Sequence, residues 1–487
     1  MFERRDVWKL GSEADPWDPI IRWYARAITA LKGRARTNPT SWRYLAAIHG
    51  TFIQRSDWPQ GATWNGCQHS SWFFLPWHRI YLHYFEHIVR RTIVDLGGPD
   101  DWALPYWDYN DPQRPNARSL PPAFRDPQMP SGDPNPLFVS ERSQQNPDIN
   151  NGGRLDALDV EIGAAMAETS FTGPSDDGIA GFGGPITDWN HSGGPVGSLE
   201  RTPHGNVHIG VGGFQPPGLM SRFETAALDP IFWLHHANID RLWEAWLGQV
   251  DPDRQNPRRA RWRDASFKVG QGAPAVTLTV REVLDTTQPP LNYKYSDVSL
   301  PALAPDAVLA ARFDVESVFA EEGAVPEDEE LVPEMVGASE NRVPLAAEPT
   351  EVEVAVETPS GPALREGAEG PQPRKVYLKV ENVRGKELVA PSYLVYVNLP
   401  PGADPATYED RRAGQVPMFG VLEASESDEE HSGSGLTFSF DITGVVQRLR
   451  EAGDWDPQRL RVTFIPARVG AEQGGDVSAG RVSLYYA

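Results

Sequence analysis

The chain has very little cysteine, since Cys67 is the only one in 487 residues. A disulfide framework and a cysteine-built zinc module both need several sulfur atoms, so both are excluded. Any bound metal is therefore expected to have histidine or carboxylate ligands.

Long apolar runs are also missing, because no stretch reaches the roughly 18 residues that a membrane helix needs. Met1–Asp6 has no apolar segment behind it and does not resemble a secretory signal. The sequence predicts a protein that has no membrane partner. Its location is expected to be the cytoplasm or stays unknown, because a leader that had been removed would not be visible in this sequence.

Positive charge is scarce: 45 Lys and Arg stand against 67 Asp and Glu, which gives a formal net charge of -22. This surplus of acid repels nucleic acid, so no nucleic-acid partner is expected. Hydrophobic residues make up 40% of the chain and 16 residues are Trp, a composition typical of folded globular proteins.

Two periodicities divide the chain. In the first 300 residues or so, apolar residues recur at three and four positions, which predicts helices at Pro19–Leu31, Ser41–His49, Pro76–Leu96 and Asp229–Leu247. Later segments alternate with period two, which predicts strands at Thr350–Val356, Lys375–Val380, Tyr393–Asn398, Leu436–Asp441 and Leu460–Ile465. We expect a mainly α domain over residues 1–300, an acidic linker over 301–330, and an all-β sandwich over 331–487.

The histidines are clustered: the chain has 11, and nine of them are His49, His69, His78, His83, His87, His204, His208, His235 and His236. His204 and His208 are spaced i, i+4, so on a helix their rings share one face and can ligate one ion. A zinc protease would have Glu directly after the first of these, but Gly205 stands there. The pair therefore predicts a metal site of another kind.

A third ligand for this pair is expected from the segment that begins at Asp229. Asp229 is a predicted N-cap and Pro230 lies in the first turn of the helix. Adjacent helical residues diverge by about 100°, so only one of His235 and His236 can join the pair.

The first cluster provides a second set of three, His49, His69 and His78. His83 and His87 lie further along the same predicted helix and are expected to face away. Two sites built from imidazole alone suit a borderline ion such as copper better than magnesium or calcium, which need oxygen ligands.

Two long motifs are more specific than this clustering. They are Cys67–Arg79 (CQHSSWFFLPWHR) and Asp229–Arg241 (DPIFWLHHANIDR). Both resemble the copper-binding blocks of the tyrosinase and catechol oxidase family, the polyphenol oxidases with a type-3 dinuclear copper centre. The resemblance covers about residues 1–300 and implies a four-helix bundle around two copper ions, with dioxygen as co-substrate and small phenols as substrates.

The resemblance also implies the ligand sets. The first copper would be held by His49, His69 and His78, and the second by His204, His208 and His236, with His235 as a neighbour. Cys67 stands two residues before His69, a spacing at which many family members form a thioether to the histidine. The alternative is a buried, inert thiol.

Four further residues match functional positions of the family. Glu200 matches a glutamate that holds a water near the second copper, and Phe223 matches an aromatic gate above the first. The alternatives are a solvated loop Glu and a core Phe. Asn238 and Asp240 would orient ligands and anchor the helix, although Asp240 could equally form an ordinary surface ion pair with Arg241.

One departure bears on the reaction. Gly205 follows His204 where members active on monophenols often have Asn, and Asn206 stands one position too late. We therefore predict oxidation of o-diphenols to o-quinones, with hydroxylation of monophenols left open as a second activity. An o-aminophenol oxidase and a haemocyanin-like oxygen carrier are the alternatives, followed by a structural module with incidental histidines.

The end of the catalytic part is also recognisable. Tyr293-Lys294-Tyr295 resembles the Tyr-x-Tyr motif that closes the family's catalytic domain. The β-rich remainder resembles the C-terminal domain that covers the copper site in latent family members. It is expected either to shield the site or to act as a stabilising module.

Overall fold

The computed structural model describes most of the chain, namely residues 1–12, 15–144, 148–173, 179–251, 253–301, 333–357, 364–367, 370–373, 375–427, 433–470 and 475–487. The predicted acidic linker over 301–330 lies outside the described residues except for residue 301. Within the described ranges, no helix combines the length and the apolar character needed to cross a membrane.

The chain divides into two compact units. Unit 1 consists of Met1–Gln68, Phe73–Glu161 and Val207–Pro301, whereas unit 2 consists of His69–Trp72, Ile162–Asn206 and Ala302–Ala487. The β-rich C-terminal region therefore shares its unit with two segments from the first half of the chain.

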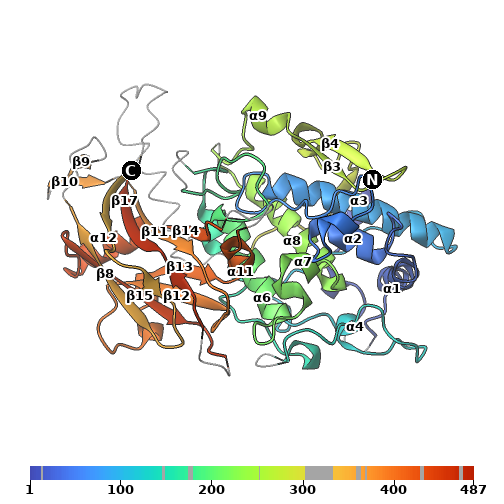
Figure 1. Ribbon diagram of the computed structural model, residues 1–487, viewed down its shortest axis with the longest axis horizontal. Helices are drawn as coiled ribbons and strands as arrows, with labels where there is room; N and C mark the ends of the chain where they lie inside the picture. Colours follow the sequence, from blue (N-terminus) through green and yellow to red (C-terminus); the bar gives the residue numbers. More distant parts are fainter. Residues whose placement is uncertain are drawn as a thin grey trace. The chain divides into compact units, whose positions relative to one another are not determined.

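Unit 1 is mainly helical (Figure 1). Its helices are α1 (Pro19–Lys32), α2 (Trp42–His49), α3 (Phe74–Asp95), α4 (Pro122–Arg125), α7 (Phe223–Ala226), α8 (Pro230–Leu247) and α9 (Ala260–Arg263), while α6 (Asn206–Gly212) begins at the boundary of the units. All four predicted helices are confirmed, and their starts follow from local chemistry. The side chains of Asp18, Ser41 and Asp229 accept hydrogen bonds from backbone N–H groups in the first turns of α1, α2 and α8.

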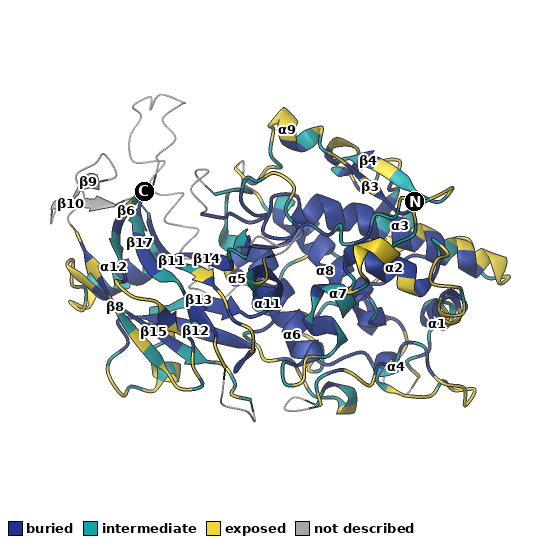
Figure 2. Ribbon diagram, in the orientation of Figure 1, coloured by how far each residue is buried: buried dark blue, intermediate teal, exposed yellow. Residues whose placement is uncertain are grey.

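The core of unit 1 is the contact between α3 and α8, which are buried along most of their length (Figure 2). The rings of Phe85 and Trp233 stack with centroids 3.5 Å apart, and Tyr81 packs against Trp233 at 4.7 Å. Because aromatic pairs of this kind contribute beyond their buried area, they set the spacing of the two helices.

Short strands complete unit 1. Strand β1 (Phe2–Arg4) pairs in parallel with β5 (Tyr293–Tyr295), and β3 (Ser266–Val269) pairs antiparallel with β4 (Val276–Thr279). The first pairing brings the start of the chain to the Tyr-x-Tyr segment.

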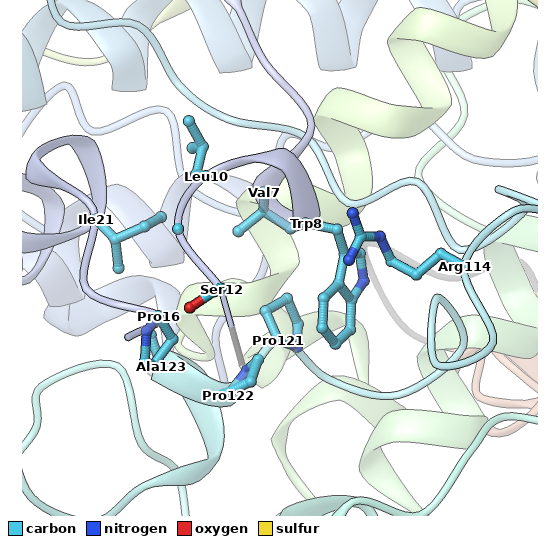
Figure 3. Close-up of a pocket in the computed structure, with 11 residues that line it drawn as sticks. Val7, Trp8, Leu10, Ser12, Pro16, Ile21, Arg114, Pro121, Pro122 and Ala123 are labelled. Atoms are coloured by element: carbon cyan, nitrogen blue, oxygen red, sulfur yellow. The ribbon is translucent and has the colours of Figure 1, made fainter. Parts of the chain in front are cut away.

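A small cavity lies near the start of the chain in unit 1 (Figure 3). It is lined by residues that include Val7, Trp8, Ile21, Arg114 and Pro121, and its volume is about 20 Å³. This volume is enough for a single water molecule, so the cavity has no room for an aromatic substrate.

Unit 2 contains a nine-stranded sheet in the order β13-β12-β15-β8-β6-β17-β11-β14-β2 (Figure 1). The strands are β2 (Gly194–Pro195), β6 (Glu334–Ala338), β8 (Thr350–Val356), β11 (Val376–Val383), β12 (Ser392–Val397), β13 (Arg412–Pro417), β14 (Leu436–Asp441), β15 (Arg459–Pro466) and β17 (Arg481–Tyr486). All five predicted strands are confirmed. The expected sandwich needs correction, because β17 pairs with both β11 and β6 and so joins the strands into one large curled sheet.

Smaller elements complete unit 2. These are α5 (Gly163–Ala167), α11 (Val421–Ser425), α12 (Thr443–Glu451), and the two-stranded pairs of β7 (Val343–Pro344) with β16 (Ser478–Ala479) and β9 (Leu364–Gly367) with β10 (Gly370–Pro373). Strand β2 pairs in parallel with β14, so the segment before residue 206 is part of the sheet of unit 2.

Candidate metal centre

Unit 1 brings together four of the six predicted ligands. His49 ends α2, His78 lies in the second turn of α3, and His208 and His236 lie in α6 and α8. All four side chains are buried. Burial lowers the pKa of His78 to about 3 and holds that of His208 well below its ordinary value, so both rings are neutral near pH 7.

Backbone carbonyls orient three of these rings. The Nδ1 atoms of His49, His78 and His208 lie 2.9, 2.8 and 2.8 Å from the carbonyl oxygens of Phe223, Phe74 and Met220. Because a carbonyl oxygen only accepts, each Nδ1 carries the hydrogen and each Nε2 carries the lone pair. A metal-binding imidazole is held in this way, with one nitrogen donating to the protein and the other facing the ion.

The distances between rings fit a shared cation. The Nε2 atoms of His208 and His236 are 3.2 Å apart. Two ligands at the usual metal–nitrogen distance in a tetrahedral site would be about 3.3 Å apart. Ring nitrogens of His49, His78 and His236 lie within 4.8 Å of one another, and the rings of His78 and His236 stack at 4.6 Å.

Phe232 forms an apolar wall beneath these rings in unit 1. Its ring centroid lies 4.2 Å from that of His236, 5.0 Å from that of His49 and 5.8 Å from that of His208. Phe232 has no role among the predictions made from the sequence, although its place in the second of the two long motifs, Asp229–Arg241, was a usable signal.

Unit 2 brings together the other two predicted ligands, His69 and His204, whose ring centroids are 5.7 Å apart. His204 donates from Nδ1 to the carbonyl of Glu200 at 3.1 Å. His69 lies outside any helix, and Asn190 holds its backbone: the His69 N–H donates to the Asn190 carbonyl at 3.1 Å, and Asn190 Nδ2 donates to the His69 carbonyl at 3.1 Å.

Glu200 is buried in the same unit, so it is not a solvated loop residue. Its two carboxylate oxygens accept from the backbone N–H of Ser70 at 2.9 and 3.0 Å. Burial raises the pKa of Glu200 to about 8, and the hydrogen bond from Ser70 partly opposes that rise. The carboxyl group therefore lies between the segments that carry His69 and His204.

Gly205 and Asn206 occupy the positions after His204. Gly205 ends the π-helix Glu200–Gly205 (η4), and Asn206 begins α6. Asn206 Nδ2 donates to Thr202 Oγ1 at 3.3 Å. No side-chain amide stands directly after His204, as the sequence indicates.

Three further candidates lie close to ligands in unit 1. The Phe223 ring meets the His49 ring edge to face at 6.2 Å. His235 is buried with its ring centroid 5.0 Å from that of His208, and its Nδ1 lies 3.5 Å from the Tyr109 hydroxyl. Cys67 is buried, and its Sγ lies within 4.8 Å of a ring nitrogen of His49.

Asp240 is the centre of a buried charge network. It accepts from Arg79 Nε at 2.6 Å and Arg4 Nη1 at 3.3 Å, and from the hydroxyls of Tyr293 and Tyr295 at 2.5 Å each. Burial alone would raise the pKa of Asp240, but the charges of Arg79 and Arg4 outweigh it and hold the pKa below its ordinary value. The alternative of a surface ion pair with Arg241 is wrong.

Arg241 instead bonds to Asn238 and Asp108. Its Nε donates to Asn238 Oδ1 at 2.7 Å, and its Nη2 lies 3.0 Å from Asp108 Oδ1. His83 is partly exposed and His87 is exposed, as expected for rings that face away from the ligands.

Phe419 is a residue of this site that the sequence did not reveal. It follows β13 and precedes α11, and its ring lies 6.3 Å from the His69 ring and 5.5 Å from the His204 ring, edge to face in both cases. No sequence signal connects a phenylalanine of the β-rich region to histidines more than 200 residues earlier.

Comparisons with known proteins agree with these clusters. Residues 39–249 match the model described as the common central domain of tyrosinase, and residues 332–487 match a domain of unknown function, DUF7868. The chain is 36% identical to tyrosinase HcTyr1 of Hahella sp. (strain CCB-MM4), over 100% of this chain and 99% of that relative. It is 30% identical to the chloroplastic polyphenol oxidase of Malus domestica over 58% of this chain and 47% of the relative, so it spans about half the length of that plant protein.

Solved structures share the fold. Latent apple tyrosinase matches with a TM-score of 0.62 and 23% identity, over 100% of this chain and 97% of that one. Latent aurone synthase matches with a TM-score of 0.61 and 20% identity, over 100% of this chain and 89% of that one. The helical core with buried histidines therefore has the fold of the plant polyphenol oxidases.

The chain belongs to the tyrosinase and polyphenol oxidase family. It is a copper-dependent oxidoreductase of the tyrosinase and catechol oxidase type, and phenols are the general class of compound that it oxidises.

Proposed function

We propose that the chain oxidises o-diphenols to o-quinones with dioxygen, using two copper ions. His49, His69 and His78 would hold one ion, and His204, His208 and His236 the other. The observation that carries this proposal is the hydrogen bonding of the rings in each unit. Four imidazoles donate Nδ1–H to a backbone carbonyl and so direct the lone pair of Nε2 away from the backbone.

The donor set favours copper. All six proposed ligands are imidazoles, which suit copper in both of its redox states and leave positions open for dioxygen and substrate. When bound, copper supplies the electron transfer between the diphenol and dioxygen, which no side chain of the site can perform. The protein contributes position, exclusion of water and a proton acceptor.

Glu200 is proposed as that proton acceptor. Its carboxylate is buried, and Ser70, the neighbour of His69, holds it with a backbone N–H. With a pKa of about 8, a fraction of the Glu200 carboxyl groups is ionised near neutral pH, and that ionised form can take the phenolic proton as the substrate binds. Phe223 would stack against the substrate ring, and a thioether from Cys67 would restrict the ring of His69.

The residue after His204 favours diphenols over monophenols. Gly205 offers no side chain, and Asn206 is bonded to Thr202, so neither residue provides the amide that activates a held water in monophenol hydroxylases. We propose hydroxylation of monophenols as the weaker activity. Asn238 and Asp240 are proposed as positioning residues near His236, because Asp240 joins α8 to Arg79 of α3, and Asn238 holds Arg241, which pairs with Asp108.

We propose that residues 1–300 provide the catalytic part and that the region from 331 to 487 shields it. The support lies within unit 2, where the Phe419 ring packs edge to face on both His69 and His204. A phenyl ring at that place occupies the space that a substrate ring would need.

The test compares the copper-loaded full-length chain with its Phe419→Ala and Phe419→Tyr variants. We expect Phe419→Ala to raise the rate of 4-tert-butylcatechol oxidation on the order of tenfold, because the cover is lost, whereas Phe419→Tyr keeps an aromatic ring in place. Phenol and o-aminophenol are measured alongside, and a faster rate on aminophenol would favour an aminophenol oxidase. A copper-loaded Phe419→Ala protein that binds dioxygen reversibly but oxidises none of the three substrates would favour an oxygen carrier and overturn the proposal.

A further inference from the structure

Gly205 lies against the turn that carries Phe419. The segment Pro417–Gly420, which we name the tail turn, begins at the last residue of β13 within unit 2. A Cβ atom added to Gly205 would lie 3.4 Å from Pro417 Cγ and 3.5 Å from Phe419 Cβ, and also 3.5 Å from the carbonyl oxygen of Glu200. Three neighbours thus surround the place of a side chain at residue 205.

The backbone at this position does not itself require glycine. Gly205 is absent from the residues with positive φ, so an L-residue could adopt its conformation without strain. The close neighbours are the reason why a side chain is hard to place. One methyl group would make ordinary contacts at 3.4–3.5 Å, whereas the three further heavy atoms of an asparagine would have to displace something.

The neighbour that can move is the tail turn. The backbone N–H of Ser70 donates to both carboxylate oxygens of Glu200, and the same helical turn contains Arg201, whose Nη1 donates to the carbonyl of Ser439 in β14. The contacts on the tail turn are side-chain atoms, Pro417 Cγ and Phe419 Cβ, whereas the contact on the other side is the backbone carbonyl oxygen of Glu200. Overpacking is therefore relieved on the side of the tail turn, where side-chain atoms must shift and a backbone carbonyl need not.

We propose that the missing side chain at residue 205 is what allows the tail turn to seat Phe419 against His69 and His204. The inference rests on the proposed function, because it concerns the same shielding residue. Residue 205, which lacks the amide side chain associated with monophenol hydroxylation, is then also the residue against which the tail turn packs. An asparagine at 205 would lift Phe419 from the two imidazoles. In this chain an amide at 205 and a tail turn packed on His69 and His204 therefore exclude each other.

The test is a double-mutant cycle on the full-length, copper-loaded chain. We expect Gly205→Asn to raise catechol oxidation on the order of tenfold while Phe419 is present, and to give no such rise in the Phe419→Ala background. Gly205→Ala should change the ratio of rates between the two backgrounds by less than about twofold, since a single methyl group fits.

Gly444→Asn is the matched control, because it makes the same change in unit 2 where the nearest atom to an added Cβ is the flexible end of Arg448 at 3.5 Å. Gly444→Asn should leave the rate of catechol oxidation unaltered in both the wild-type and the Phe419→Ala backgrounds. A Gly205→Asn rise of equal size in both backgrounds would overturn the inference, because the substitution would then act on the chemistry and not on the tail turn.

A second readout needs neither copper nor turnover. Hydrogen–deuterium exchange of the copper-free protein should be faster across residues 416–425 in Gly205→Asn and unchanged in β11 and β14, whose pairing serves as the folding control. Unchanged exchange across 416–425 would contradict the inference. If Phe419→Ala is itself inactive with full copper content, the proposed function fails, whereas this exchange measurement still decides whether residue 205 controls the tail turn.

Discussion

The Asp240→Asn substitution tests how much the buried charge network contributes to stability. Asp240 and Arg79 are buried, with side-chain exposures of 4% and 0% and a distance of 2.6 Å. The substitution removes the charge that faces two buried guanidinium groups, those of Arg79 and Arg4. Arg79 keeps Glu244 and Arg4 keeps Glu86, each at 2.7 Å, so the two guanidinium groups lose one acidic partner and not all of them. Breaking a buried pair costs about 3–5 kcal/mol, and we expect the free energy of unfolding to fall by an amount at the lower end of that range at pH 7.

Asp264→Asn is the matched control. Asp264 also pairs with an arginine, Arg281, at 2.5 Å, but the two side chains are 59% and 54% exposed. Solvent screens such a pair, and its loss should cost about 0–1 kcal/mol. The two acidic residues differ in burial and in the number of partners, since Asp240 also accepts from Arg4 and two tyrosines whereas Asp264 pairs with Arg281.

Urea denaturation, monitored by tryptophan fluorescence, measures the free energy of unfolding of both variants. Their m-values, the dependence of that free energy on urea concentration, are compared to detect a change in the unfolding reaction. The pKa of Asp240 is held below its ordinary value, so its contribution is present above pH 4 or so and is lost as the pH falls below that. The gap between wild type and Asp240→Asn should therefore narrow in acid. Equal costs for the two variants at pH 7 would refute the reasoning from burial.

Two further predictions concern unit 1. Burial raises the pKa of Asp6 to about 6, and its Oδ2 has no hydrogen-bond partner in the described part of the chain. The buried negative charge of Asp6 therefore destabilises the folded state at pH 7, and Asp6→Asn should raise the free energy of unfolding by about 2–3 kcal/mol at that pH. This gain in stability should disappear near pH 4, where Asp6 is neutral in the folded state. A gain that persists at pH 4 in urea denaturation would contradict the raised pKa of Asp6. A Cβ at Gly50 would clash with the backbone carbonyl of Phe223, whose oxygen accepts from His49 Nδ1, so Gly50→Ala should cost about 1–3 kcal/mol and weaken copper binding. Gly33→Ala, with its nearest neighbour at 3.5 Å, should cost less than about 0.5 kcal/mol, and equal losses in calorimetry would count against the packing argument.

The sequence predicted the elements whose signals are local. Asp229 caps α8 as expected because an N-cap needs only the next few residues, and the strand of Leu436–Asp441 matches its period-two pattern. The sheet order depends on contacts between distant residues and was not predictable in the same way. Arg201 and Ser439, which are 238 residues apart, illustrate this.

The same contrast holds for the candidate site. The ligand candidates could be named because imidazole spacing and two long motifs point to metal binding, and within each unit the structure places those rings close together. Asp240 remained ambiguous because its partners Arg4 and Tyr293 come from opposite ends of unit 1. Phe419 was missed because an apolar residue in a turn gives no sign of what it covers.

The copper content of the reconstituted full-length chain tests the central claim most directly. We expect two copper ions per wild-type chain, one in His208→Ala, and two in His235→Ala, whose buried histidine is a neighbour and not a proposed ligand. A wild-type chain that binds one copper ion or none, or a His208→Ala chain that retains two, would contradict the proposed pair of copper sites.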